Sequence, residues 1–320
     1  MKVLVLGSAA GGGFPQWNCA CRLCSAFRRG ELGGAARTQS SVAISQDQGR
    51  SWILLNASPD IAAQILANPM LQPSMAPYGT ANGATLRRSP IKAVVLTDAQ
   101  LHNVAGLLSL RESQRLEVFA TPMVFEDLTT GLPLLHVLDH YAAVHWHLVP
   151  VAGAVTTAPF QIEGFPDLRL HAIAVPGRTP PHAPRRGETI GECIALHIED
   201  TRSGQRFFFA PALAEVGSNE LGWMGEADCL MVDGTLWDEH ELRDAGLAPF
   251  SASELGHLPL ADFEGRIGML RRLGEAPATA RKILTHVNNS NPILDEAGGQ
   301  RQALTESGIE VAHDGMVIEL

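Results

Sequence analysis

The sequence predicts an α/β protein in which mixed β-sheets are covered by helices. Short apolar runs that end at polar or small residues recur along the chain, which is typical of buried strands. Helix-like segments lie between these runs. One pair of runs flanks the turn segment DTRSGQ, as in a β-hairpin. Alternation of this kind, with some antiparallel neighbours, favours mixed sheets.

The expected strands share an apolar run followed by polar or small residues. They are 2–7 (KVLVLG), 52–58 (WILLNAS), 91–99 (IKAVVLTDA), 206–212 (RFFFAPA), 229–235 (CLMVDGT) and 281–286 (RKILTH). The hairpin would pair 192–198 with 206–210. We expect the chemistry of the protein at the ends of these strands.

The helical pattern recurs between the strands, at 60–67, 103–112, 121–130, 238–246, 260–273 and 294–306. Asp60 is expected to cap the first of these helices, and Asn291-Pro292 to set the start of the last. Proline and glycine concentrate at 175–191. This stretch is expected to be a long loop, which either lies near a functional site or is a surface loop without a functional role.

Composition narrows the functional classes. The chain has 320 residues, 45% of them hydrophobic and 18% charged, as in an ordinary soluble globular protein that forms one large domain or two closely merged ones. A net charge of −10 argues against a nucleic-acid surface. No apolar run approaches the roughly 20 residues that span a membrane. Met1 leads directly into a strand-like run, so we expect a cytoplasmic protein.

Three cysteines, Cys19, Cys21 and Cys24, form a Cys-x-Cys-x-x-Cys cluster shortly after the first expected strand. Thiolates at this spacing can reach one tetrahedral zinc ion, and a fourth ligand must come from elsewhere. The odd number of cysteines, five, argues against a disulfide. Structural zinc is the favoured interpretation, with free thiols and redox chemistry as alternatives. Cys193 and Cys229 lie in apolar runs and are expected to be small buried hydrophobic residues.

A second cluster begins after the expected 91–97 strand, in TDAQLHNVAG. Its layout is similar to the metallo-β-lactamase motif T-H-x-H-x-D-H-x-x-G, with Asp98, Gln100, His102 and Asn103 at the four ligand positions. The two leading histidines of that motif, which help to hold two metals, are absent. The scaffold of the motif is therefore kept, but its ligand set is changed.

The similarity to this superfamily continues downstream. PGRT at 176–179 stands where a ligand histidine of PGHT would be. Asp233 ends the run CLMV, His257 lies in GHLPL, and His286 follows the run ILT. Asp233, His257 and His286 are candidate ligands of a metal-binding cleft.

Several long segments resemble the pyrroloquinoline quinone (PQQ) biosynthesis protein B family. They are VLGSAAGGGFPQWNCAC with LC at 23–24, ARTQSS at 36–41, NASPD at 56–60, LLSLRE at 107–112, MVDGTLW at 231–237 and THVNNSNPILDE at 285–296. The resemblance runs from end to end. It implies a metallo-β-lactamase-like αββα sandwich over residues 1–320 and a role in making PQQ from a ribosomal precursor peptide.

The resemblance also bears on the fourth zinc ligand. Related phosphodiesterases close their Cys-x-Cys-x-x-Cys site with a histidine three residues after the last catalytic histidine, and the matching position here is Asn289. Either Asn289 supplies an oxygen, or a nearby histidine or a water completes the tetrahedron. His286 is the nearest such histidine, but we favour it for the cleft.

For the cleft, the resemblance implies a metal held by His102, Asp233, His257 and His286, with Asp98 and Gln100 as flanking polar groups. Two histidines with one carboxylate are typical of non-haem Fe(II) oxygenases. The family is linked to iron-dependent hydroxylation of the tyrosine ring in a Glu-Tyr intermediate. The expected cofactors are thus a structural zinc and Fe(II) in the cleft.

One departure from the family pattern weakens this expectation. Members commonly read T-D-x-Q-x-D-H, whereas this chain has Leu101-His102-Asn103 in place of x-D-H. Asparagine is a poor ligand for transition metals, so one coordination position is weakened. His102 either donates instead or points away.

Two other functional classes remain open at this stage. A carrier or binding protein for PQQ or its precursor, assisting transport to the periplasm, would need a pocket but no redox metal. A metal-dependent hydrolase is the least favoured, because the H-x-H pair is missing. The expected partners are PQQ or its precursor and other PQQ biosynthesis proteins, with a homodimer left open.

Overall fold

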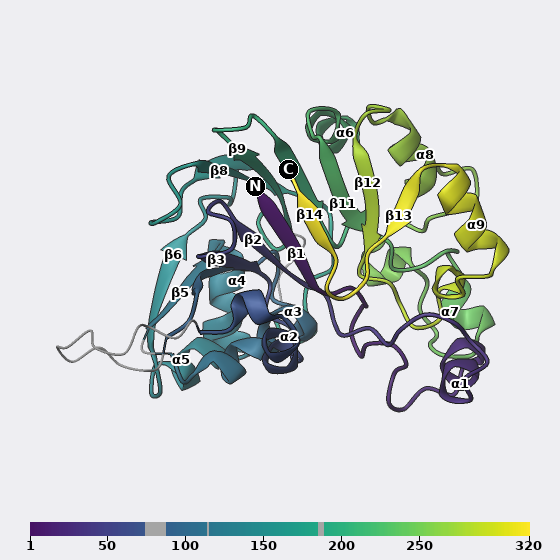
Figure 1. Cartoon of the computed structure of the whole chain (residues 1–320), viewed down its shortest axis with the longest axis horizontal. Helices are drawn as coiled ribbons and strands as arrows, with labels where there is room; N and C mark the ends of the chain where they lie inside the picture. The colour runs from purple at the N-terminus through teal and green to yellow at the C-terminus, as the bar shows by residue number, and fades with distance from the viewer. Residues whose placement is uncertain (74–87, 114, 185–188) are drawn as a thin grey trace.

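Two seven-stranded β-sheets pack face to face in the computed structural model of the chain (Figure 1). The structure describes residues 1–73, 88–113, 115–184 and 189–320. Helices cover the outer face of each sheet, and their apolar side chains form a separate cluster there. This is the expected αββα sandwich of two mixed sheets.

The first sheet is mixed, antiparallel from β14 to β3 and parallel from β3 to β6. In spatial order its strands are β14 (Val317–Glu319), β1 (Lys2–Gly7), β2 (Ser41–Ser45), β3 (Trp52–Leu55), β4 (Ile91–Val95), β5 (Arg115–Ala120) and β6 (Ala143–Leu148). The first and last strands of the chain lie side by side (Figure 1), so both termini belong to this sheet.

The second sheet is parallel from β13 to β10 and antiparallel from β10 to β7. Its strands in order are β13 (Ile309–Val311), β12 (Arg281–Thr285), β11 (Cys229–Asp233), β10 (Arg206–Ala210), β9 (Ile194–Asp200), β8 (Leu168–Ala174) and β7 (Thr157–Phe160). Because β10, β11 and β12 are parallel, their carboxyl ends meet at one edge of the sheet. Polar residues that follow these strands are thereby brought together.

The helices are short. The α-helices are α1 (Arg22–Arg28), α2 (Ile61–Ala67), α3 (Leu101–Val104), α4 (Pro122–Glu126), α5 (Leu134–Leu138), α6 (Ser218–Gly225), α7 (Glu241–Asp244), α8 (Met269–Glu275) and α9 (Gly299–Glu306). The remaining helical turns are η1 (Pro69–Leu71), η2 (Ala105–Leu110), η3 (Asp127–Gly131), η4 (Ser253–Leu255) and η5 (Pro292–Leu294).

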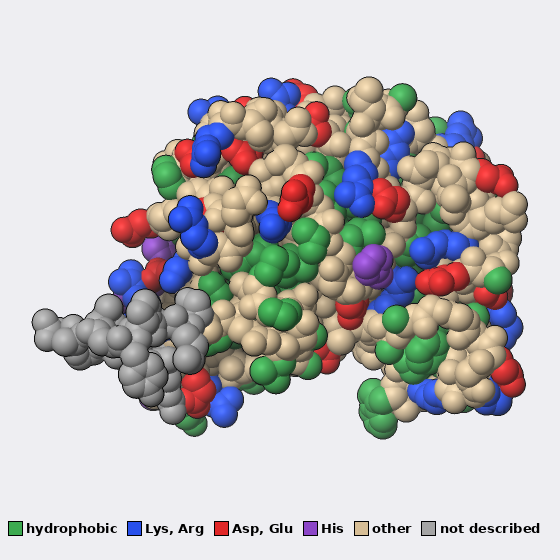
Figure 2. All heavy atoms as spheres, viewed as in Figure 1, with side chains coloured by type: hydrophobic (Ala, Val, Ile, Leu, Met, Phe, Trp, Pro, Cys, Tyr) green, Lys and Arg blue, Asp and Glu red, His purple; other side chains and the backbone are tan. Residues whose placement is uncertain are grey.

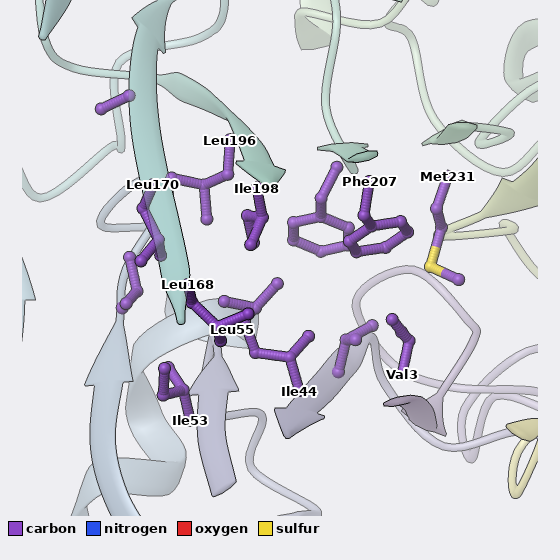
Figure 3. Close-up of a cluster of buried hydrophobic side chains, with 14 of the residues drawn as sticks. Val3, Ile44, Ile53, Leu55, Leu168, Leu170, Leu196, Ile198, Phe207 and Met231 are labelled. Atoms are coloured by element: carbon purple, nitrogen blue, oxygen red, sulfur yellow. The ribbon is translucent and has the colours of Figure 1, made fainter. Parts of the chain in front are cut away.

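The main core lies between the two sheets (Figure 3). Val3, Ile44 and Leu55 from the first sheet point toward Leu170, Ile198, Phe207 and other residues of the second. On β10, Phe207 and Phe209 enter this core, whereas Phe208 packs under the outer helices. All three rings are fully buried, because β10 is covered on both faces.

Charged side chains of both signs are interspersed over the face in Figure 2, so the described part of that face carries no large area of one sign. Among the described residues, no helix is long and apolar enough to cross a membrane.

The sequence located the central strands well. β1 has the predicted bounds, and β3, β4, β10, β11 and β12 begin at the predicted residues and end one to four residues earlier. The predicted hairpin is confirmed, since β9 and β10 are antiparallel neighbours. Cys193 and Cys229 are buried free thiols, as predicted.

Several local predictions are wrong. Residues 260–268 are not helical, and α8 spans Met269–Glu275. The last helix begins at Gly299 rather than near 294, because the Asn291 side chain caps the separate turn η5. Asp60 does not cap α2; its carboxylate accepts hydrogen bonds from the backbone and side-chain amides of Gln39. Tertiary contacts outweigh local signals at these ends.

Candidate metal centres

The three cysteines of the N-terminal cluster converge, and their sulfur atoms lie within 4.8 Å of one another. Cys21 is the N-cap of α1, and its sulfur accepts the backbone N–H of Cys24 at 3.5 Å. The Cys21 N–H in turn donates to the sulfur of Cys19 at 3.4 Å. Backbone N–H groups that point at sulfur favour the thiolate form, which is the form that binds metal.

Asn289 closes the open side of this cluster. Its side-chain nitrogen lies 3.1 Å from the sulfur of Cys19, 3.7 Å from that of Cys21 and 3.5 Å from that of Cys24. Turning the amide over would present its oxygen at the same place. The structure therefore brings together the residues predicted for a structural zinc, Cys19, Cys21, Cys24 and Asn289.

The pKa values of two thiols move in opposite directions. Burial acts to raise the pKa of Cys21, but hydrogen bonds from Cys24 and Cys19 outweigh it and lower the pKa. Burial raises the pKa of Cys24 to about 11, and the neighbouring Cys21 adds to the increase. One thiolate is thus favoured without metal, whereas a bound cation would be needed to stabilise all three.

The second cluster forms where the parallel strands of the second sheet end. Ligand atoms of Asp233, His257 and His286 lie within 4.8 Å of one another. Asp233 is the last residue of β11 and His286 directly follows β12, with φ of 57°. The Asp233 carboxylate lies 2.7 Å from Nδ1 of His257.

Thr235 is a member of this site that the sequence analysis missed. Its hydroxyl lies 2.6 Å from Asp233 Oδ1, 2.8 Å from His286 Nδ1 and 3.2 Å from His257 Nδ1. A single hydroxyl therefore contacts Asp233, His257 and His286 and can fix their orientation. A signal was available, since Thr235 lies two residues after Asp233 in the D-G-T segment that follows the strand.

His102 joins the cleft from the first sheet's side. It lies on α3, and its Nε2 is 3.0 Å from Nε2 of His286. Behind it, a side chain at Gly11 would come within 3.3 Å of the His102 ring. The absence of a side chain at Gly11 leaves space for the imidazole.

Asp98, Gln100 and Asn103 are occupied with other partners. Both oxygens of Asp98 accept hydrogen bonds from the Asn103 side chain, at 2.9 and 2.8 Å. The Gln100 side chain donates to the carbonyl of Arg178 at 3.0 Å. Asp98 and Gln100 line the cleft, as expected of flanking groups, whereas the Asn103 amide is turned toward Asp98.

The three histidines differ in their electrostatics. Burial lowers the pKa of His102, and burial together with the two neighbouring histidines lowers the pKa of His286 well below its usual value. Burial also acts to lower the pKa of His257, but the Asp233 carboxylate outweighs it and the pKa is raised. His102 and His286 are therefore held neutral, the form in which imidazole binds metals.

A cavity of about 190 Å³ opens onto this cluster. The cavity is lined by residues of both sheets' connecting segments, including Gly11, Gln100, His102, Thr235, His257 and His286. The cysteine cluster does not line it. A ligand in this cavity can reach His102, His257 and His286.

The fold and the cluster at the ends of β11 and β12 define a metallo-β-lactamase superfamily protein. Residues 51–287 match the family described as Beta-lactamase superfamily domain. Over its full length the chain is 48% identical to Coenzyme PQQ synthesis protein B of Ectopseudomonas mendocina, covering 100% of both chains. It is 45% identical to the Klebsiella pneumoniae subsp. pneumoniae protein of that name, covering 98% of that relative. The chain belongs to the coenzyme PQQ synthesis protein B family.

Solved structures agree with this assignment. The Zn(2+)-bound PqqB crystal structure from Methylobacterium extorquens is 35% identical, covers 100% of both chains and has a TM-score of 0.87. A diphosphatase of the PhnP family shares the fold at 17% identity, with a TM-score of 0.64 over 100% of this chain and 96% of its own. The expected family and fold are thereby confirmed.

Proposed function

We propose that this protein acts in PQQ biosynthesis as a metal-dependent hydroxylase of the tyrosine ring in a Glu-Tyr precursor. The observation that carries the proposal is the cluster of Asp233, His257 and His286 beside an open cavity. Two imidazoles and one carboxylate are the ligand set of non-haem Fe(II) oxygenases, which leave coordination positions open. The names of the family's members support the pathway.

In this proposal Asp233, His257 and His286 would hold the iron, and His102 is close enough to His286 to contribute a third nitrogen as a fourth ligand. The iron, when bound, supplies activation of oxygen. Thr235 orients Asp233 and His286 through its hydroxyl.

The hydroxylation has a definite balance of atoms and electrons. One atom of O₂ enters a C–H bond of the tyrosine ring, which is already a phenol, to give a second ring hydroxyl, and the other atom leaves as water. Two electrons and two protons must come from an external two-electron reductant, such as ascorbate in an assay.

We propose a separate, structural role for zinc at the cysteine cluster. Three thiols and the Asn289 amide surround one point, and Cys21 is the N-cap of α1. Such closed sites stabilise the fold and leave no position for substrate. We further propose that residues 1–320 form one domain, because both sheets share one core, and that the protein works in the cytoplasm beside other PQQ biosynthesis proteins.

The test combines metal content with product formation. Protein purified without oxygen and reconstituted with Fe(II) should contain one zinc and one iron per chain. Added Glu-Tyr, ascorbate and ¹⁸O₂ should yield a dipeptide with one labelled ring hydroxyl. No labelled product at full iron occupancy would rule out the hydroxylase.

One observation favours a second candidate, a binding protein for PQQ or its precursor. Asn103 occupies Asp98 instead of offering a metal ligand, so the cleft has fewer donors than the family's usual motif implies. Zinc alone in the reconstituted protein, together with tight binding of PQQ, would favour this function over hydroxylation.

A further inference from the structure

Arg178 lies where two cavities adjoin. The cavity of about 190 Å³ at the histidine cluster and a larger cavity of about 900 Å³ are both lined by Arg178, Cys193 and Gly256. The larger volume falls within the about 300–1,000 Å³ that small-molecule sites occupy. A molecule that extends from the histidines into the larger cavity therefore passes Arg178.

The Arg178 residue is held in place by its neighbours. Its guanidinium lies over the Phe250 ring, 5.4 Å from the ring centre, and its carbonyl accepts the Gln100 side chain at 3.0 Å. A side chain at Gly256, where φ is +81°, would come within 2.7 Å of the backbone nitrogen of Arg178. Gly256 directly precedes His257, so the backbone of Arg178 packs against the segment that carries a cleft histidine.

Arg178 has no carboxylate partner among the described residues. It is the only lysine or arginine among the described residues that line either cavity, and its guanidinium forms no ion pair with any of the described carboxylates. The arginine is half-buried, and its guanidinium contacts the Phe250 ring. A half-buried guanidinium without a carboxylate partner can bind a carboxylate with two parallel hydrogen bonds.

The carboxylates near the larger cavity already have partners. Glu254 pairs with Arg243 at 2.6 Å, and Glu220 accepts the backbone N–H of Gly217 at 2.8 Å. Glu192 accepts the Thr179 hydroxyl at 2.6 Å. These groups reduce the general attraction of the cavity for anions, but none of them neutralises the Arg178 guanidinium.

We propose that Arg178 binds a carboxylate of the substrate at the junction of the two cavities. The substrate class is then a small aromatic acid, with its ring at the histidine cluster and a carboxylate on Arg178. This inference rests on the proposed function, because it concerns the substrate of the same cleft.

The test measures the binding of Glu-Tyr to the zinc-loaded full-length protein by calorimetry, without oxygen. Two further probes, Glu-Tyr amide and Gln-Tyr, each lack one carboxylate. In the wild type, one of these replacements should weaken binding at least tenfold. In R178Q the same replacement should weaken binding less than twofold. In R178K the loss of affinity should lie between those of the wild type and R178Q.

Matched controls separate binding from folding. Arg271 is exposed and pairs with Asp262, so R271Q should bind Glu-Tyr within twofold of the wild type. R178Q should keep the zinc content and unfolding temperature of the wild type. If R178Q is unstable, R178K carries the comparison, because it retains the charge but loses the paired hydrogen bonds.

The outcomes distinguish this inference from the proposed function. If R178Q and the wild type bind Glu-Tyr with affinities that agree within twofold, the role of Arg178 is overturned, but the proposed hydroxylase function is not. Arginine-dependent binding without hydroxylation would overturn the hydroxylase and leave Arg178 in place. If the wild type binds only PQQ, the affinities of the same variants for PQQ are compared. A loss of affinity in R178Q then supports the proposal that Arg178 binds a carboxylate of the ligand. Binding of none of these probes would overturn both.

Discussion

The two clusters of candidate metal ligands differ in how they are enclosed. In the cysteine cluster the sulfurs face Asn289 and backbone N–H groups, and the protein itself fills the fourth side. In the cleft cluster the His257 side chain keeps 13% of its surface exposed and a cavity opens beside it. Closed ligand sets of the first kind are typical of structural metal sites, whereas an open position beside the ligands is typical of catalytic ones.

The two clusters are nevertheless joined by one short segment. His286 lies in the cleft, and Asn289, three residues later, contacts the cysteines. Between them the Asn288 N–H donates to the Thr235 carbonyl at 3.0 Å. Disorder in this segment would therefore affect both clusters, even though only one of them faces a cavity.

The largest expected effect comes from Cys21→Ser. Serine can still cap α1 but does not supply the thiolate, so this change should release the proposed structural zinc and lower the free energy of unfolding by more than about 4 kcal/mol. Elemental analysis and thermal unfolding measure both effects. Cys193→Ser is the control, because that buried thiol lies outside the cluster and should keep the zinc. Full zinc and unchanged stability in Cys21→Ser would contradict the structural assignment.

His257→Ala is expected to lose the metal of the cleft but to keep its fold. Removing a residue that only supports a metal ligand lowers metal affinity by up to about 100-fold. Removing the ligand itself, the His257 imidazole, should lower the affinity for Fe(II) by more than that. The fold should survive, because Asp233 keeps hydrogen bonds from Thr235 and the Leu213 N–H. Anaerobic iron titration and circular dichroism test this, with exposed His145→Ala as control. An unfolded His257→Ala protein would argue that the cleft cluster is structural too.

Glu241 tests the segment that joins the clusters. Its carboxyl accepts hydrogen bonds from Ser290, directly after Asn289, and from the Trp237 N–H. Burial raises the pKa of Glu241 to about 7. The unfolded chain loses this proton near pH 4.5, whereas the folded protein keeps it to about pH 7. Stability should therefore fall as pH rises through this range.

The size of this pH effect follows from the shift. The change in pKa from 4.5 to about 7 corresponds to about 3 kcal/mol, so Glu241→Gln should be more stable than the wild type at pH 8 by about that amount and similar at pH 4. Urea unfolding at the two pH values measures the difference. An equal pH dependence in both proteins would show that another group is responsible.

The smallest effect is expected for the double change His102→Asp plus Asn103→His, which restores the family's usual pair. It removes the amide that occupies Asp98 and supplies an imidazole in its place, so Fe(II) affinity should rise about tenfold. A competition titration with a chelator gives the ratio. An unchanged or lower affinity would show that His102 already serves as an effective ligand.

The sequence alone was sufficient for features that depend on neighbouring residues. The apolar runs marked β1, β3, β4, β10, β11 and β12, because a buried strand must be apolar over its whole length. The Cys-x-Cys-x-x-Cys spacing predicted a convergent cluster for the same kind of local reason. The longer similarity to a family then predicted the sandwich and placed Asn289 near the cysteines.

Only the tertiary structure decided how distant segments meet. Thr235 contacts Asp233, His257 and His286 because β11 and β12 are parallel neighbours and end at one edge. Asn103 is turned to Asp98, and Arg178 lies between two cavities, through contacts that no spacing in the sequence encodes. The helix predicted over 260–273 failed for a related reason: local helical patterning could not show that the 260–268 segment hydrogen-bonds to distant residues, as the Leu260 and Ala261 N–H groups do with Leu236 and Trp237. Spacing along the chain fixes which residues can be neighbours locally, whereas the packing of the two sheets determines which of them share a site.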